Sequence, residues 1–210
     1  FRGFDEAGKP VAISIPPTLL ISALGLMDDV ANAVSLDFKR PGDALYLLGV
    51  TRDELGGSEW LAMLGEHPAS GQVPAVDLAA NRALYASLSR AIEAGLIASA
   101  QSVGRGGLGV ALAMSAAGGL LGATVSLDAA APGCSPEVAL FSESAGRVLV
   151  SVAPTDQAAF EARFAGLACA PIGEVRDDGR IEIDGLGGEP AISLDVDSLA
   201  AAYRATFSGY

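Results

Sequence analysis

The sequence predicts an α/β fold, and three observations indicate this class. Half of the 210 residues are apolar, while aromatic residues make up only 6%, so the core must be built from closely packed Leu, Val, Ile and Ala. Short apolar runs of strand length alternate with longer segments of helical periodicity. Glycines bound many of these segments, as tight connections between strands and helices require. A chain of this length can bury one substantial core.

The first part of the chain predicts an incomplete structure. A polar turn at residues 5–9 precedes an apolar segment from Val11 to Met27, and together they resemble half of a hairpin. Pro16 and Pro17 cannot donate hydrogen bonds to a sheet, so this strand is expected to bulge or to lie at an edge. The chain is therefore expected to be a fragment whose partner strands precede it. An exposed apolar strand would drive self-association, which sedimentation can test.

The segment from Asp43 to Glu59 combines a strand with a polar loop. Residues 44–48 form a short apolar run suited to a strand that is covered on both faces. Gly56 and Gly57 permit unusual backbone angles, and Ser58 and Glu59 place a hydroxyl and a carboxylate where a helix is expected to begin. Two interpretations remain open: a strand that delivers a binding site, or a plain strand-to-helix connection capped by Ser58.

Helices and further strands are predicted in turn after this loop. A helix over residues 77–94 is expected to end at Gly95, and a second over residues 107–117 at Gly118 and Gly119. The inward residues are expected to be Leu84, Leu88, Ala91 and Ile92 in the first helix, and Leu108, Ala111, Leu112 and Ser115 in the second. Strands are predicted at residues 122–127, 137–141 and 147–152.

The last third of the sequence predicts two more helices and a hairpin. Thr155 is expected to cap a helix that ends near Phe164. Strands at residues 172–176 and 180–183 flank Asp177-Asp178-Gly179, which is typical of a tight hairpin turn. The final helix is expected to be capped by Asp195 or Asp197 and to bury Leu199, Ala202 and Phe207.

Composition excludes several functions. A net charge of −12 and a pI near 4.3 argue against a nucleic-acid surface or an anionic membrane as partner, because both need clustered Lys and Arg. No apolar stretch has the length of a membrane span, so a cytoplasmic protein is expected. Cys134 and Cys169 lack metal-ligand spacing and are interpreted as free thiols. His67, the one histidine, precedes Pro68 in a loop and is expected to face solvent, which leaves no catalytic triad.

Three polar loops hold the candidate binding residues. The first is the loop at residues 56–59 described above. The second, Gly104 to Gly107, opens a helix, where free backbone amides and the helix dipole can hold an anion; the alternative is that its glycines serve packing. The third places Ser142, Glu143 and Ser144 with Gly146 and Arg147 in one turn, and its alternative is a solvated hairpin turn. A phosphate-gripping Gly-Lys-Ser/Thr loop is absent.

Four segments in order carry a resemblance to a known family: ISIPPTLLISALGLMDDV, KRPGDALYLLGVTRDELGGSEW, RGGLGVALA and ALFSESAGRVLVSV. They resemble the second half of phosphoribosylformylglycinamidine synthase, of the aminoimidazole ribonucleotide synthetase superfamily, from about Ile13 to Phe207. The resemblance implies a C-terminal α/β domain over residues 36–210, with a mixed sheet and flanking helices. Residues 1–35 would be the terminal strand of the preceding barrel-forming domain.

The resemblance also implies an activity for the parent enzyme. This is the ATP-dependent conversion of an amide to an amidine in purine biosynthesis, with magnesium and with ammonia from a glutaminase domain or subunit. The expected partners are therefore the rest of the synthase chain and the glutaminase, and a homodimer is a further candidate. No cofactor is assigned to this fragment with certainty. Most of the catalytic machinery is expected outside these residues.

The candidate site is interpreted as a silent twin of the active site. The nucleotide- or phosphate-binding residues of this pseudo-site are expected to be Gly56, Gly57, Ser58, Glu59, Arg105, Gly106, Gly107, Ser142, Glu143, Ser144 and Arg147. Where the family often has His-Asp-x-Ser-Asp-Gly-Gly-Leu, this chain reads Gln-Ser-Val-Gly-Arg-Gly-Gly-Leu from Gln101, and Ala145 replaces a frequent Gln. The loss of acidic and imidazole groups predicts that this half does no chemistry. Two alternatives remain: another ATP-using superfamily member, such as a selenophosphate synthetase, thiamine phosphate kinase or hydrogenase-maturation protein, or a stand-alone structural or binding module.

Overall fold

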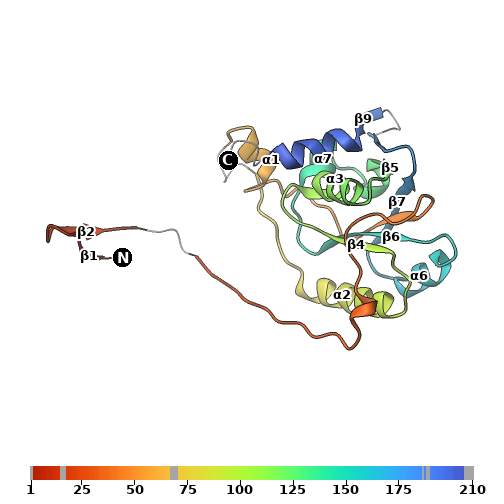
Figure 1. The fold of residues 1–210 in the computed structure, drawn as a ribbon, viewed down its shortest axis with the longest axis horizontal. Helices are drawn as coiled ribbons and strands as arrows, with labels where there is room; N and C mark the ends of the chain where they lie inside the picture. The colour runs from red at the N-terminus through yellow and green to blue at the C-terminus, as the bar shows by residue number, and fades with distance from the viewer. Residues whose placement is uncertain (1, 15–17, 67–70, 186, 188–189, 206–210) are drawn as a thin grey trace. The chain divides into compact units, whose positions relative to one another are not determined.

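The computed structural model describes residues 2–14, 18–66, 71–185, 187 and 190–205, and the chain forms two compact units, Phe1–Ala31 and Asn32–Tyr210. The first unit contains a two-stranded antiparallel sheet, in which β1 (Arg2–Phe4) pairs with β2 (Pro10–Ala12) (Figure 1). Asp5 shapes the turn between them, because its Oδ1 accepts hydrogen bonds from the Ala7 and Lys9 amides at 2.9 and 2.8 Å. The prediction of half a hairpin was therefore wrong, because β1 and β2 supply both strands of this one.

The long strand predicted from Val11 to Met27 is wrong beyond Ala12. Residues 13–14 and 18–27 form no strand, and Pro16 and Pro17 lie outside the described residues. A strand needs a neighbour to complete its hydrogen-bond ladder, and the described sheet of this unit contains only β1 and β2. The apolar side chains of this segment are nevertheless open to solvent, with Leu24 93% and Leu26 96% exposed. A short 3-10 helix, η1 (Val30–Asn32), follows the segment.

The second unit is built on a seven-stranded mixed sheet in the order β4-β6-β3-β7-β5-β8-β9. All neighbouring strands are antiparallel except β5 and β8, which run parallel. The strands are β3 (Ala44–Leu48), β4 (Ser99–Val103), β5 (Gly122–Ser126), β6 (Arg147–Val152), β7 (Cys169–Arg176), β8 (Arg180–Asp184) and β9 (Pro190–Asp195). The prediction of a mixed sheet is confirmed.

Helices cover both faces of this sheet, with α3 and α7 on one side and α2 and α6 on the other (Figure 1). The helices are α1 (Glu59–Met63), α2 (Leu78–Glu93), α3 (Gly107–Gly119), α4 (Leu127–Ala130), α5 (Pro136–Phe141), α6 (Gln157–Arg163) and α7 (Val196–Ala205). Strand β3 shows why its sequence is continuously apolar. Leu45 and Leu47 pack in the core under α3, while Tyr46 and Leu48 pack in the core under α2 and α6.

The two central helices follow the sequence prediction closely. Asp77 caps α2, because its Oδ1 accepts a hydrogen bond from the Ala80 amide at 3.0 Å, and Gly95 follows the helix with a φ of +70°. The inward residues predicted for both helices are buried or half-buried. Gly118 and Gly119 have a different role from the predicted one, since α3 continues through them. A Cβ at Gly119 would lie 2.3 Å from the Phe38 carbonyl oxygen, so this glycine allows close packing.

Three predictions about local structure were wrong. Residues 137–141 belong to helix α5, which Ser135 caps by accepting from the Val138 amide and which Pro136 opens. Thr155 does not cap α6, which begins after Asp156. Ala202 is exposed in α7, whereas Val196 and Ala200 are buried and Leu199 is half-buried. Asp195 Oδ2 accepts the predicted capping hydrogen bond from the Ser198 amide at 2.9 Å. The predictions for Phe207 and His67 fall on residues outside those described.

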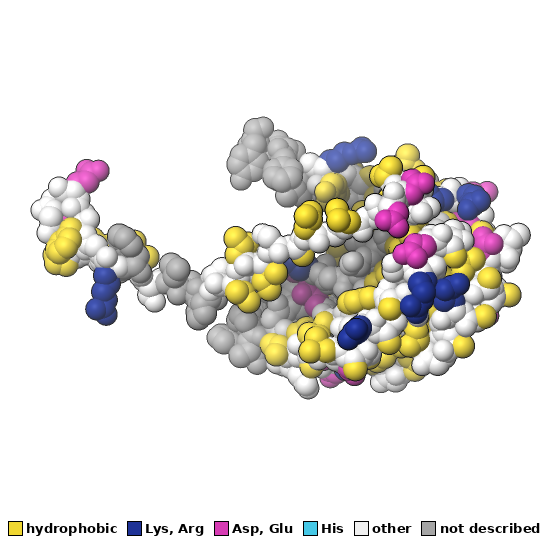
Figure 2. All heavy atoms as spheres, turned by 90° about the horizontal axis from the view of Figure 1, so that it is seen from below, with side chains coloured by type: hydrophobic (Ala, Val, Ile, Leu, Met, Phe, Trp, Pro, Cys, Tyr) yellow, Lys and Arg dark blue, Asp and Glu magenta, His cyan; other side chains and the backbone are white. Residues whose placement is uncertain are grey.

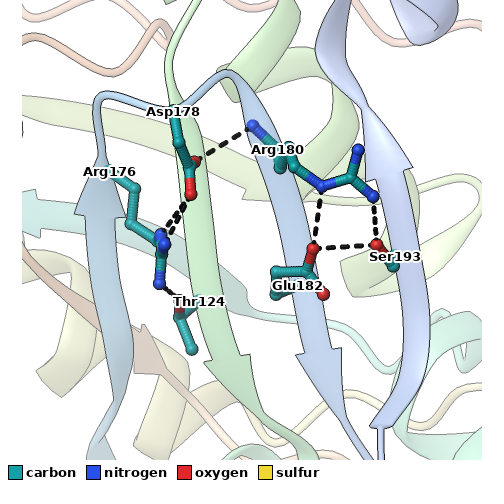
Figure 3. Close-up of polar contacts among 6 residues, drawn as sticks. All are labelled: Thr124, Arg176, Asp178, Arg180, Glu182 and Ser193. Carbon is teal, nitrogen blue, oxygen red and sulfur yellow. Dashed lines mark hydrogen bonds and ion pairs between the residues drawn. The ribbon is translucent and has the colours of Figure 1, made fainter.

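The predicted hairpin at Asp177-Asp178-Gly179 was also wrong, because β5 lies between β7 and β8 (Figure 3). Gly179 has the positive φ that the turn requires, +66°. Arg176 on β7 donates from Nη1 to Thr124 Oγ1 on β5 at 3.2 Å and from Nε to Asp178 Oδ2 at 2.8 Å. A Cβ at Gly122 would lie 2.6 Å from Asp178 Oδ1, so the turn crosses the end of β5 where that strand has no side chain.

Candidate functional site

Three strands bring the predicted loops to one edge of the sheet. In the antiparallel register Leu48 lies opposite Val148, and Val103 lies opposite Arg147. The ends of β3 and β4 therefore meet the start of β6. We call the loops at this edge, residues 51–59, 104–107 and 142–147, the loop cluster. The structure thus brings together all three of the polar loops singled out in the sequence.

Glu143 joins two of these loops through a single carboxylate oxygen. Its Oε1 accepts a hydrogen bond from the Glu59 amide at 2.9 Å and another from the Gly106 amide at 2.9 Å. The first amide opens α1, and the second belongs to the N-cap residue of α3. The amides expected to hold an anion therefore hold a carboxylate of the same chain.

Arg105 lies beside this contact and is paired within the cluster. Its Nε donates to Glu59 Oε1 at 2.7 Å, and its Nη2 donates to the same oxygen. The Glu59 carboxylate raises the pKa of the Arg105 guanidinium, and Glu143 contributes to the same effect. The Arg105 side chain is 82% exposed, so this ion pair is open to solvent and to competing ions.

The two serines of the third loop face inward. Ser142 Oγ donates to the Arg52 carbonyl at 2.8 Å, Ser144 Oγ accepts from the Arg52 amide at 3.0 Å, and the two hydroxyls lie 3.0 Å apart. Both serines are 0% exposed. They hold the segment after β3 in place, and neither hydroxyl reaches the surface.

Arg147 is a deeply buried charge of the loop cluster, at 2% exposure. Its Nε donates to the Ser144 carbonyl at 3.1 Å, its Nη1 to Thr51 Oγ1 at 2.9 Å, and its Nη2 to the Ser142 carbonyl. Burial lowers the pKa of Arg147 to about 10, while Glu54 and Glu143 act in the opposite direction. The guanidinium remains charged at neutral pH and fixes the turn around Glu143.

The glycines and the helix cap of the cluster have structural explanations. A Cβ at Gly56 would lie 2.6 Å from the Gly71 carbonyl oxygen, and one at Gly107 would lie 2.4 Å from the Leu140 carbonyl oxygen. Gly57 and Gly106 have φ values of +72° and +80°. Ser58 caps α1 by accepting from the Leu61 amide at 3.3 Å, which agrees with the capping interpretation of this loop.

Glu54 in the loop cluster, and Trp60 and Phe141 next to it in the sequence, carried no recognisable sequence signal. Glu54 is 2% exposed, accepts from the Ala75 amide at 3.0 Å through Oε1, and has a buried Oε2 without a hydrogen-bond partner. Trp60 stacks on Phe141, with ring centroids 4.2 Å apart and planes 2° from parallel. These contacts join positions that are more than 20 residues apart in the chain, so local pattern could not find them.

The described residues contain no group of three or more His, Cys, Asp or Glu placed to hold a metal ion. Cys134 and Cys169 are free, and burial raises the pKa of the Cys169 thiol to about 11.

In the part of the chain that the structure describes, no helix is both long and apolar enough to cross a bilayer. On the face in Figure 2, acidic and basic side chains lie in small separate groups.

A mixed sheet covered by helices on both faces, with polar loops gathered at one edge, defines a three-layer α/β domain. Comparison with protein families then gives the assignment. The model of "AIR synthase related protein, C-terminal domain" matches residues 40–185, more than half of the chain. The chain belongs to this family, which confirms the fold class that the resemblance implied.

Known proteins give the same result at finer detail. The subunit PurL of phosphoribosylformylglycinamidine synthase from Parafrankia sp. is 42% identical over 91% of this chain and 24% of its own length. Among solved structures, Thermotoga maritima PurL complexed with FGAR has a TM-score of 0.69 and 26% identity, over 81% of this chain and 30% of that one. PurLQS from T. maritima has a TM-score of 0.65 and 25% identity, over 81% and 28%. The chain spans about a quarter of the length of the curated relatives it matches.

Proposed function

We propose that this chain is the C-terminal α/β domain of the second half of a cytoplasmic phosphoribosylformylglycinamidine synthase, and that it performs no chemistry itself. The parent reaction would be the ATP-dependent, magnesium-requiring conversion of an amide to an amidine. Identity of 42% to a PurL subunit over 91% of the chain supports the synthase over other members of the superfamily. Residues 1–35 would complete the preceding domain of the parent.

One observation carries the non-catalytic part of the proposal. Three polar groups of the loop cluster that could act on a substrate are engaged within the chain: Glu143 with two backbone amides, and the Ser142 and Ser144 hydroxyls with the Arg52 backbone. A general base or a nucleophile must reach the atom on which it acts. Two fully buried hydroxyls and a carboxylate held by two amides do not meet this condition.

The loop cluster is, on this proposal, the pseudo-site of the synthase, and its role is to support the other half. The partners would be the rest of the synthase chain and a glutaminase that supplies ammonia. The relative described as PurLQS carries several components in its name, which is consistent with such an assembly. ATP and magnesium would bind to parts of the parent outside the described residues.

An activity assay tests the proposal directly. The 210-residue chain is incubated with ATP, magnesium, ammonia and formylglycinamide ribonucleotide, and amidine formation is measured beside the full-length synthase that contains it. We expect product only from the full-length enzyme. Amidine formation by the chain alone at the rate of the full-length enzyme would overturn the non-catalytic assignment.

A further inference from the structure

We propose that Glu143 is an internal ligand of the loop cluster: its carboxylate occupies the anion position between the starts of α1 and α3, so the cluster keeps itself closed to phosphate. This inference rests on the proposed function, because it concerns the pseudo-site. The inference goes beyond the proposed function, because it predicts that the Glu143 side chain already fills the site.

The geometry of the contact is that of an anion held by backbone amides. Two N–H groups from loops that are far apart in the sequence, those of Glu59 and Gly106, donate to the same oxygen at 2.9 Å each. Backbone amides at helix starts bind phosphate oxygens in this way. A phosphate at these amides would therefore have to displace Glu143.

The side chains around Glu143 alternate in burial along the segment that follows α5. Ser142 and Ser144 on either side point inward and are fully buried, while Glu143 between them is half-buried. Alternate residues of an extended chain point to opposite sides, so burying the two serines turns the carboxylate toward α1 and α3. Arg147 fixes this turn by bonding the Ser142 and Ser144 carbonyls.

The local charge balance also disfavours an added anion. The guanidinium groups of Arg105 and Arg147 are matched by the carboxylates of Glu59 and Glu143, and Glu54 adds a buried carboxylate near Arg147. With Arg52 and Asp53, which also belong to the loop cluster, four carboxylates oppose three guanidinium groups, and a phosphate dianion would add to this negative excess. Removing the Glu143 carboxylate frees two amides and lowers this negative charge in a single change.

The experiment compares the wild-type chain with Glu143→Ala, using inorganic phosphate and ADP as probes. Calorimetry measures affinity, and ¹⁵N NMR follows the Glu59 and Gly106 amides. We expect no saturable binding by the wild type, and phosphate binding at least tenfold tighter by Glu143→Ala, with shifts at both amides. Glu93→Ala is the matched control, because it removes an exposed carboxylate at the end of α2 and should behave as wild type.

A second variant and a measurement on the wild type cover the case in which Glu143→Ala does not fold. Glu143→Gln keeps an oxygen that can accept both amide hydrogen bonds, so it should remain closed and bind phosphate more weakly than Glu143→Ala. In the wild type, hydrogen exchange at the Glu59 and Gly106 amides should be slow and unaffected by phosphate. The proposal fails if those amides are unprotected, if phosphate shifts them in the wild type, or if a folded Glu143→Ala binds no phosphate. None of these results bears on amidine synthesis, so the proposed function is tested separately.

Discussion

The two ends of the sheet contain the same types of residue in opposite environments. At the loop cluster, Arg147 is 2% exposed and bonds a threonine hydroxyl and two carbonyls. At the Asp177–Gly179 turn, exposed Arg176 bonds a threonine hydroxyl and a carboxylate. In both guanidinium groups each of the three nitrogens donates a hydrogen bond. The number of hydrogen-bond partners therefore does not indicate how much a charged side chain contributes to stability. We expect the burial of the side chain to determine that contribution.

The substitution Arg147→Ala should give the largest effect. It removes three buried hydrogen bonds and leaves the Ser142 and Ser144 carbonyls and Glu54 uncompensated, so we expect a loss of about 3 kcal/mol in the free energy of unfolding. Urea denaturation followed by circular dichroism measures it. A loss no larger than that of Arg176→Ala would show that burial does not separate the two ends.

Glycine at the two ends provides the second test. Gly107 (φ +67°) has the Leu140 carbonyl oxygen 2.4 Å from its missing Cβ, whereas Gly179 (φ +66°) has open space there. Alanine at either site should cost about 1 kcal/mol through its positive φ, and alanine at Gly107 about 2 kcal/mol more through the backbone clash. Equal losses in urea denaturation of the two variants would contradict the close packing of α3 against α5.

Asp43 tests whether burial or position in the sheet determines the effect of a charge. It lies at the same end of the sheet as the Asp177–Gly179 turn, yet it is only 1% exposed. Burial raises the pKa of Asp43; the charge of Arg40 opposes this rise and that of Asp156 adds to it. In contrast, the hydrogen bond from Arg176 lowers the pKa of Asp178. The stability that Asp43 contributes to the wild type is therefore lost as pH rises through the folded-state pKa of Asp43. The stability that Asp178 contributes is lost as pH falls through the folded-state pKa of Asp178.

The measurement for this third test is urea denaturation between pH 3.5 and 7. Relative to wild type, Asp43→Asn should gain stability as pH rises, because it removes the charge that burial penalises. Asp178→Asn should lose stability over the same range. The same sign for both variants would mean that burial does not control the titration of Asp43.

The smallest effect is expected for Arg176→Ala. The ion pair with Asp178 is exposed and screened by salt, so its loss should lower the free energy of unfolding by only a small fraction of the loss expected for Arg147→Ala in urea denaturation at about 0.15 M salt. A clear loss of stability would show that the tie to Thr124 across β5 holds the strand order, and would weaken the contrast with Arg147.

Local signals predicted the elements that local physics determines. Asp77 and Gly95 bound α2 as expected, and the apolar run of β3 is buried on both faces. The segment at residues 137–141 shows the limit, because a short apolar run suits either a strand or a helix. The Ser135-Pro136 helix start was the signal that could have decided it.

Long-range pairing was beyond the reach of the sequence. Nothing near Asp178 indicates that β5, more than 50 residues earlier, enters between β7 and β8. Strand β4 was missed because its sequence, SAQSV, lacks the apolar pattern of a buried strand, and the hydroxyl of its buried Ser99 hydrogen-bonds to Ser151 Oγ at 2.7 Å, more than 50 residues away. The loop cluster was predicted as a set of residues, but the partner of its amides, Glu143, follows from tertiary contacts alone.

The stack of Trp60 on Phe141 has a practical consequence. Trp60 is the only tryptophan of the chain, and it directly follows Glu59, whose amide bonds Glu143. Its indole ring is half-buried and lies parallel to the ring of the residue before Ser142. Intrinsic fluorescence excited at the indole band therefore reports on one place in the molecule, so this domain carries its own optical probe for the opening of α1 from α5.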